Sequence, residues 1–173
     1  MKTKLYIGCG APGAGKSYYF CRFMNNLISK GEKVAYISRD RIRFALLDSK
    51  DEYFDYEDEV WKVFVKKIQK QLDVNCPTVI ADATHLTPKA RTKLLDALNL
   101  HDTEIIPVSF EMPTWVCIKQ NKLRKNSDYA YVPKGVVRRM NEQFIYPTFD
   151  EKYKYAEIIR INKKEKKRDL PDQ

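Results

Sequence analysis

Residues 10–17 read GAPGAGKS and match the pattern G-x-x-x-x-G-K-[ST]. An apolar segment, residues 4–9 (KLYIGC), precedes them, and a stretch with helical character, residues 17–29 (SYYFCRFMNNLIS), follows. Glycines at these positions let backbone N–H groups converge on phosphate oxygens, and the dipole of the following helix favours the same anion. The segment therefore predicts a phosphate-binding loop between a strand and a helix.

The last two residues of this loop carry the polar side chains. In such loops the lysine, here Lys16, reaches the β- and γ-phosphates of a nucleoside triphosphate, and the hydroxyl, here Ser17, is offered to Mg²⁺. We therefore expect ATP or another NTP, together with Mg²⁺. The residues predicted to contact the nucleotide are Gly10, Ala11, Pro12, Gly13, Ala14, Gly15, Lys16, Ser17 and Tyr18.

A second pattern overlaps the first. Residues 8–13 also spell G-x-G-x-x-G, which is typical of dinucleotide-binding folds, and Asp40 could then bind a ribose. This alternative leaves Lys16 and Ser17 without a role, so we favour the triphosphate site.

Short β-rich segments alternate with helical patterns along the chain. Residues 57–72 (EDEVWKVFVKKIQKQL) are an example of the helical pattern, because apolar residues recur every four positions on one face. The alternation predicts an α/β fold with a parallel sheet between helices, in which ligands bind beyond the carboxyl ends of the strands. The expected strands lie near residues 4–9, 33–38, 78–83, 104–111 and 156–161.

An acidic residue at the end of a later strand, Asp82, helps to indicate the type of phosphate chemistry. Asp82 ends the apolar run TVIAD, so Ser17 and Asp82 are the predicted metal-site residues. Ala83 stands where many P-loop ATP hydrolases keep a glutamate, and residues 121–124 (NKLR) lack the final aspartate of the guanine-binding pattern. Both features favour phosphoryl transfer to an acceptor hydroxyl over hydrolysis or GTP switching.

A transferase also needs a group that holds the acceptor hydroxyl. Residues 34–43 (VAYISRDRIR) end an apolar run on charges, and Asp40 lies where the strand should end. Since the transition state of phosphoryl transfer is loose, a carboxylate there mainly aligns the alcohol and takes its proton late. Arg43, three residues on, is predicted to bind a phosphate of the acceptor. An N-cap role for Asp40 and a surface position for Arg43 remain open.

Residues 115–140 (WVCIKQNKLRKNSDYAYVPKGVVRRM) predict a helix, a polar loop and a second helix. Such a unit can close over phosphates and exclude water. Arg124 is the candidate to neutralise charge on the transferring group. For Arg138 two interpretations remain open, a contact made by the lid and an ion pair on the surface. Thr84 and His85, which follow the Asp82 strand, are further candidates for substrate contact.

Composition limits the setting of the protein. A net charge of +9 over 173 residues makes a polyanion such as nucleic acid a plausible partner. The four widely spaced cysteines form no zinc-like pattern, and no apolar run approaches a membrane span. We expect a soluble, intracellular, cytoplasmic protein. The oligomeric state, including a homo-oligomer, is left open.

Five segments occur in the order and spacing of the phage-type polynucleotide 5′-hydroxyl kinase domain, and the chain resembles this family to about residue 150. They are GCGAPGAGKS, ISRDRIRFALL, VIADATHLTPKAR, FEMPTWVCIKQNKLRK and VPKGVVRRM. The resemblance implies a P-loop kinase fold and Mg²⁺-dependent transfer of the γ-phosphate of ATP to the 5′-OH of DNA or RNA. It also implies an acceptor tunnel opposite the nucleotide entrance.

The resemblance assigns roles to matching residues. Lys16 and Ser17 would bind the donor phosphates, and Asp40 would be the general base. Arg43 would hold the 3′-phosphate of the acceptor, and Arg124 would be the lid arginine. Asp82 would brace this apparatus through an arginine or a metal-bound water.

Two positions depart from the family pattern. DATHL, residues 82–86, is one residue longer than the usual Asp-Thr-Asn-Leu, so either Thr84 or His85 fills the polar position. Gln120 stands where a second lid arginine often occurs.

The expected organisation is a P-loop kinase domain over residues 1–162, with a helical lid at about residues 114–140 and a basic, flexible tail over residues 163–173. Two other functions remain open. One is a related kinase that phosphorylates a small-molecule or tRNA-linked hydroxyl. The other is a non-catalytic, nucleotide-dependent nucleic-acid-binding protein.

Overall fold

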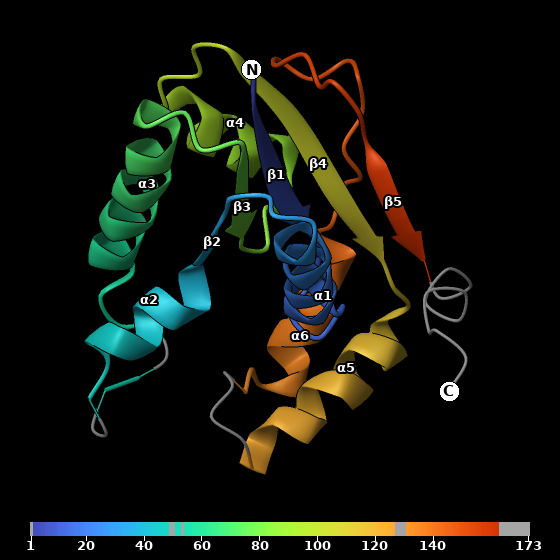
Figure 1. Cartoon of the computed structure of the whole chain (residues 1–173). Coiled ribbons are helices and arrows are strands. Elements are labelled where there is room, and N and C mark those ends of the chain that lie inside the picture. Colours follow the sequence, from blue (N-terminus) through green and yellow to red (C-terminus); the bar gives the residue numbers. More distant parts are fainter. Residues whose placement is uncertain (1, 49–50, 53, 127–130, 163–173) are drawn as a thin grey trace.

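The computed structural model describes residues 2–48, 51–52, 54–126 and 131–162, so the predicted tail lies outside the described residues. Strands and helices alternate along the chain (Figure 1), and a 3₁₀ helix, η1, follows α5. In chain order the elements are β1 (Thr3–Cys9), α1 (Lys16–Ser29), β2 (Val34–Ser38), α2 (Arg39–Leu46), α3 (Glu57–Asp73), β3 (Thr78–Asp82), α4 (Pro88–Asp96), β4 (Thr103–Glu111), α5 (Thr114–Lys122), η1 (Leu123–Asn126), α6 (Lys134–Glu142) and β5 (Ile159–Asn162).

The five strands form one parallel sheet in the order β2-β3-β1-β4-β5. Each connection between consecutive strands contains at least one helix, and the last one runs from β4 through α5, η1 and α6 to β5. All strand carboxyl ends therefore lie at one edge, where Figure 1 shows α2, α5 and α6. The register pairs Ser38 of β2 with Asp82 of β3, so the chain leaves both strands at the same level. The predicted α/β architecture is confirmed.

A hydrophobic core lies on each face of the sheet. The predicted face of α3, formed by Val60, Phe64, Ile68 and Leu72, is buried, and with α4 it covers the face that presents Leu5. The other face packs against α1, where the rings of Phe20 and Phe110 meet edge to face at 5.8 Å between centroids. Because side chains alternate along a strand, both faces of the central strands are apolar, as expected for a parallel sheet.

Two helices at the functional edge begin on capping side chains. Ser38 accepts a hydrogen bond from the backbone N–H of Arg41 and caps α2. Thr87 caps α4 by accepting from the N–H of Ala90, and Pro88 occupies the first turn. Because Ser38 fills the N-cap position of α2, the carboxylate of Asp40 lies within the first helical turn and is not the cap.

A buried ion pair joins α4 to the segment between α6 and β5. The Arg91 side chain is fully buried, and its Nη2 lies 2.5 Å from Oε1 of Glu151. The same guanidinium donates to the carbonyls of His85 and Ile145, and the hydroxyl of Tyr155 donates to Glu151 at 2.6 Å. Burial opposes ionisation of Glu151, but the hydrogen bonds from Arg91 and Tyr155 hold its pKa below the ordinary value. Arg91 thus fixes the segment after β3 against the segment after α6.

None of the helices in the described ranges is long and apolar enough to cross a membrane.

Replacing Arg91 by Met should lower the free energy of unfolding by about 3–5 kcal/mol, because the carboxylate of Glu151 is left buried without its cation. The double variant Arg91→Met, Glu151→Met should lose less, because no unpaired charge remains. Urea denaturation of both variants and the wild type measures this difference. A single variant within about 1 kcal/mol of wild type would show that the pair adds little net stability.

Candidate active site

The phosphate loop is held between β3 and α5. Gly10 donates its N–H to the carbonyl of Thr84 at 2.8 Å, and Gly13 and Gly15 adopt left-handed backbone conformations, with φ of 79° and 93°. A Cβ atom on Gly13 would lie 2.2 Å from the carbonyl oxygen of Cys117 in α5. Glycine is therefore required at position 13 both by its φ angle and by the close approach of α5.

Lys16 lies inside this loop and is buried. Its Nζ donates to the carbonyl oxygens of Gly10 at 2.8 Å and Ala11 at 2.9 Å. Burial lowers the pKa of Lys16, although the nearby carboxylate of Asp82 opposes this shift. A desolvated ammonium held by two loop carbonyls can exchange them for phosphate oxygens without leaving the loop.

Asp82 ends β3 beside Ser17. The Ser17 hydroxyl donates to Oδ2 of Asp82 at 2.7 Å, and the hydroxyl of Tyr36 in β2 donates to the same oxygen at 2.5 Å. Burial raises the pKa of Asp82 despite the nearby Lys16 and these two hydrogen bonds. The sequence analysis predicted Ser17 and Asp82 as site residues but not Tyr36. Tyr36 reaches Asp82 because β2 pairs with β3, and the sequence does not show that pairing.

The pair formed by Ser17 and Asp82 fits the demands of Mg²⁺. Magnesium prefers hard oxygen ligands and binds to proteins through one or two side-chain oxygens, with phosphate oxygens and water completing its shell. A hydroxyl and a carboxylate oxygen lie 2.7 Å apart at the amino end of α1. These are the residues that would hold the ion, which when bound would neutralise charge on the donor phosphates.

A pocket of about 220 Å³ opens beside the loop. It brings together residues from the loop, α2, the start of α3, the end of β3 and the lid. Of the predicted site residues it contains Pro12, Lys16, Ser17, Asp40, Arg43, Asp82, Thr84 and Arg124.

The wall of this pocket that α2 and the start of α3 form is a charged network, and we call it the acceptor-side wall after the role predicted for Asp40. Arg43 is 5% exposed, and its Nη1 lies 2.5 Å from Oδ1 of Asp40. Its Nε donates to Oε1 of Glu57 at 2.7 Å, and Glu57 also accepts from Arg39 at 2.9 Å. The side chain of Asp40 is 44% exposed, so its carboxylate is held by Arg43 but remains accessible from the pocket. Arg43 is thus buried, which excludes the surface position left open above.

Glu57 is a site residue that sequence reasoning missed. It belongs to an acidic stretch at the start of α3, where acids are expected for the helix dipole alone. Only the packing of α2 against α3 shows that this acid pairs with Arg39 and Arg43 on the pocket wall.

The segment predicted to form the lid contains α5, η1 and α6, and residues 127–130 within it lie outside the described residues. Asn121 is buried and joins the two sides of the lid, because its Nδ2 donates to the carbonyl of Val132 at 2.6 Å and its Oδ1 accepts from the N–H of Val132 at 3.1 Å. Arg124, in η1, lines the same pocket as Asp40. This position is compatible with the predicted contact to the transferring phosphate.

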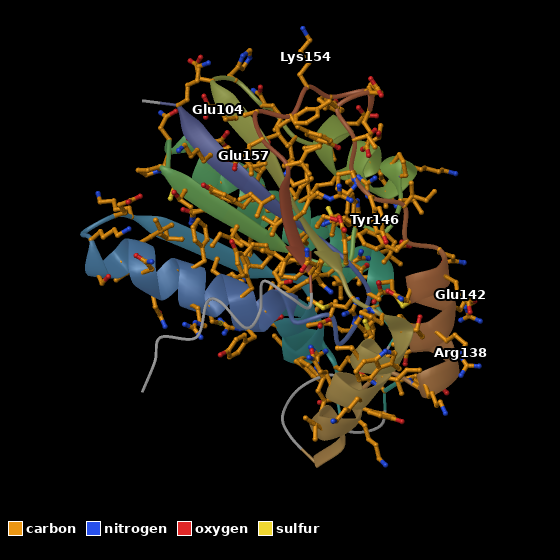
Figure 2. The ribbon with its side chains drawn as sticks, turned by 90° about the vertical axis from the view of Figure 1, so that its right-hand side faces the viewer. Glu104, Arg138, Glu142, Tyr146, Lys154 and Glu157 are labelled. Atoms are coloured by element: carbon orange, nitrogen blue, oxygen red, sulfur yellow. The ribbon has the colours of Figure 1, made fainter. Side chains whose placement is uncertain are left out.

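Eight predicted residues do not line this pocket: Gly10, Ala11, Gly13, Ala14 and Gly15 of the phosphate loop, and Tyr18, His85 and Arg138. Arg138 is exposed on α6, and Figure 2 shows it on the outer side of that helix with Glu142. Tyr18 is 56% exposed, and its hydroxyl accepts a hydrogen bond from Arg22. His85 is 5% exposed and is directed into the protein.

The buried position of His85 has a clear physical cause. Its Nδ1 donates to the carbonyl of Gly8 at 2.8 Å, and its ring lies 6.2 Å from that of Phe64. Its Nε2 is buried and has no hydrogen-bond partner among the described residues, so a proton there would be an unpaired buried charge. Burial lowers the pKa of His85 to about 4. In this arrangement Thr84, and not His85, provides the polar group after Asp82 in the pocket.

With this geometry established, comparison with known proteins identifies the family. The family profile AAA_33, described as an AAA domain, matches residues 5–147. The chain belongs to the AAA_33 family. No curated protein matches the sequence.

Three solved structures share the fold of this AAA_33 domain. A chain of the Pnkp1/Rnl/Hen1 RNA repair complex aligns with a TM-score of 0.67 and 22% identity, over 82% of this chain and 44% of that chain. A fungal RNA kinase aligns with a TM-score of 0.59 and 14% identity, over 92% and 74% of the two chains. The APS kinase CysC of Mycobacterium tuberculosis, solved with AMPPNP and APS, aligns with a TM-score of 0.61 and 16% identity, over 94% and 89%.

The TM-scores of these three alignments show a common fold. The AAA_33 domain has the P-loop kinase fold, with a nucleotide-binding loop at residues 10–17. It spans less than half of the matched chain of the RNA repair complex.

Gly13→Ala should weaken ATP binding by at least about tenfold and lower the unfolding midpoint, because the new methyl group must displace either the loop or α5. Gly31→Ala is a matched control, because Gly31 has the same φ of 79° but no atom within 4 Å of the new Cβ. Both variants carry the cost of a left-handed alanine, about 1 kcal/mol. Calorimetric titration with ATP and thermal unfolding compare them. Equal losses would show that α5 places no constraint on the loop.

The pH dependence of stability should carry the signature of His85. Its pKa falls from an ordinary 6.5 to about 4 on folding, so the unfolded chain binds a proton that the folded chain does not in this range. Stability should therefore decrease as the pH falls from about 6.5 to about 4, by up to about 1.4 kcal/mol per pH unit. His85→Asn keeps a donor for Gly8 and tolerates the positive φ, and it should flatten this slope in urea titrations. An unchanged slope would assign it to other groups.

Proposed function

We propose that this protein is a polynucleotide 5′-hydroxyl kinase that transfers the γ-phosphate of ATP to the 5′-OH end of DNA or RNA. The observation that supports this most directly is the placement of Asp40. Its carboxylate, fixed by the buried Arg43, lines the same pocket as Lys16, Ser17, Asp82 and Arg124. A hydroxyl acceptor that enters beside α2 would meet a proton acceptor and an anion-binding arginine in one place.

The donor side of the pocket supports this reaction through the loop. Lys16 would bind the β- and γ-phosphate oxygens, and Ser17 and Asp82 would hold Mg²⁺. The Tyr36 hydroxyl orients the carboxylate of Asp82 by its hydrogen bond to Oδ2. Arg124 would neutralise charge on the transferring phosphoryl group.

The acceptor side aligns the nucleophile. Asp40 would accept a hydrogen bond from the 5′-OH and take its proton as the new P–O bond forms and the bond to the leaving β-phosphate oxygen breaks. Glu57 positions the guanidinium of Arg43 through Nε. The guanidinium has five N–H donors, so it can bind an acceptor phosphate next to the hydroxyl while keeping its carboxylate partners.

The similarity in sequence motifs and the shared fold of an RNA kinase and a chain of an RNA repair complex support a nucleic acid as the acceptor. The shared fold of an APS kinase keeps a smaller acceptor as the competing outcome.

The test is transfer of label from γ-labelled ATP to a panel of acceptors with free 5′-OH groups, containing DNA and RNA oligonucleotides and mononucleosides. We expect label on the oligonucleotides. Label on nucleosides or other small hydroxyl compounds alone would replace the proposal by a small-molecule kinase. Tight ATP and oligonucleotide binding without transfer would indicate a non-catalytic binding protein.

Asp40→Asn should lower kcat by about 10²-fold or more and leave ATP affinity unchanged, because the amide cannot accept the hydroxyl proton. Asp58→Asn is the control, because Asp58 is an exposed acid in the first turn of α3 and does not line the pocket. Single-turnover rates at saturating ATP separate chemistry from binding. An Asp40→Asn rate equal to that of the control would remove Asp40 as the base.

A further inference from the structure

A second concave surface runs along α3, away from the catalytic pocket. It has a volume of about 610 Å³ and lies between α3 and the residue that follows α4, and we call it the α3–α4 groove. None of the residue roles assigned above involves it. Its lining residues are Trp61, Lys62, Val65, Lys66, Gln69, Lys70, Asp73, Val74 and Ala97.

The rim of the α3–α4 groove is basic. Lys62, Lys66 and Lys70 are exposed and recur every four residues along α3, which separates them by about 6 Å per step along the helix axis. None of the three forms an ion pair with a residue that the structure describes. Three evenly spaced lysines on one line match the repeated charge of a nucleic-acid backbone.

The acids near the groove lie mainly at its ends, and Asp58 and Glu59 are exposed in the first turn of α3, one turn before Lys62. Asp73 lies at the far end of the groove and accepts a hydrogen bond from Gln69 at 2.7 Å. Asp96 of α4 is paired with Lys152 at 2.6 Å. The charge that faces a ligand in the α3–α4 groove is therefore positive along most of its length.

The floor of the α3–α4 groove is apolar. Val65, Val74 and Ala97 line it, and the side chain of Val74 is 65% exposed. Trp61 adds an aromatic ring, and Nζ of Lys93 in α4 lies 4.8 Å from the centroid of that ring. An apolar lining beside one row of lysines suits a single strand, whose unpaired bases can lie against the lining while its phosphates meet the lysines.

The α3–α4 groove is separated from the catalytic pocket by the contact between Arg39 and Trp61. The guanidinium of Arg39 lies 5.6 Å from the centroid of the Trp61 ring and also pairs with Glu57. Arg39 and Glu57 both line the catalytic pocket, whereas Trp61 lines the groove. Since α3 begins at Glu57, the groove starts about one helical turn beyond the acceptor-side wall.

We propose that the α3–α4 groove binds the acceptor strand beyond the nucleotides held in the catalytic pocket, with Lys62, Lys66 and Lys70 on successive phosphates and the bases against the apolar lining. This inference rests on the proposed polynucleotide kinase function and extends it to single-stranded acceptors longer than the pocket can hold.

The experiment compares a 5′-OH single strand of about 3 nucleotides with one of about 12, the range over which single-strand sites of this kind are filled. The variant Lys62→Ala, Lys66→Ala, Lys70→Ala should raise KM for the long acceptor by about tenfold and leave kcat unchanged. For the short acceptor both constants should stay at the wild-type values. The matched control is Lys30→Ala, Lys33→Ala, Lys154→Ala, which removes the same charge from exposed lysines that do not line the groove.

The salt dependence of binding distinguishes the two triple variants. Both lose the same net charge, so a difference between their salt slopes would report phosphate contacts made by the groove lysines. Each phosphate contact to a single strand adds about 0.7 to the slope of log K against log salt. Binding of a labelled 12-mer should therefore lose about 2 units of slope in the groove variant and keep the wild-type slope in the control.

The possible results separate this inference from the proposed function. Oligonucleotide phosphorylation with equal effects of the two triple variants, or with no effect of acceptor length, would overturn the groove and leave the kinase function intact. No phosphorylation, but 12-mer binding that depends on the groove lysines, would overturn the kinase function and support the groove. No binding of the 12-mer by the wild type would overturn both.

Discussion

The hydrogen bonds that pair β2, β3 and β1 in parallel bring three strand ends to one edge, and each of these ends leads directly into a charged part of the pocket. β1 leads into the phosphate loop, and β3 ends on Asp82. β2 ends at Ser38, directly before α2, whose second residue is Asp40. Antiparallel pairing of any one strand would send its end to the opposite edge. The parallel register is therefore the condition under which donor and acceptor residues can share one pocket.

This edge keeps two charged groups buried at a cost to stability. Burial lowers the pKa of Lys16 and raises that of Asp82, because desolvation disfavours the charged form of each. Hydrogen bonds from the Ser17 and Tyr36 hydroxyls to Asp82, and from Lys16 to loop carbonyls, offset part of this cost. A desolvated site of this kind strengthens its attraction for phosphate and metal, because fewer water molecules compete and the groups are already oriented.

The surrounding structure supports this edge from both sides. On one side the buried pair of Arg91 and Glu151 holds the segment after β3, and the carbonyl of His85 accepts from Arg91. On the other side Gly13 lies against the backbone of α5, the first helix of the predicted lid. A shift of either support would move the loop, so residues remote from the phosphates help to determine the geometry at the site.

The local elements of this protein follow from its sequence alone. The spacing of glycines, lysine and serine in residues 10–17 defines a phosphate loop, and the four-residue apolar repeat defines the buried face of α3, because both depend on neighbours along the chain. The resemblance of five ordered motifs to one kinase family added the roles expected of Asp40, Arg43 and Arg124. Tertiary structure decided which side chains meet across elements: Tyr36 with Asp82, Glu57 with Arg39 and Arg43, and Arg91 with Glu151. It also decided that His85 is buried and that Arg138 faces outward, since burial depends on packing between segments far apart in the chain, which short-range periodicity does not encode.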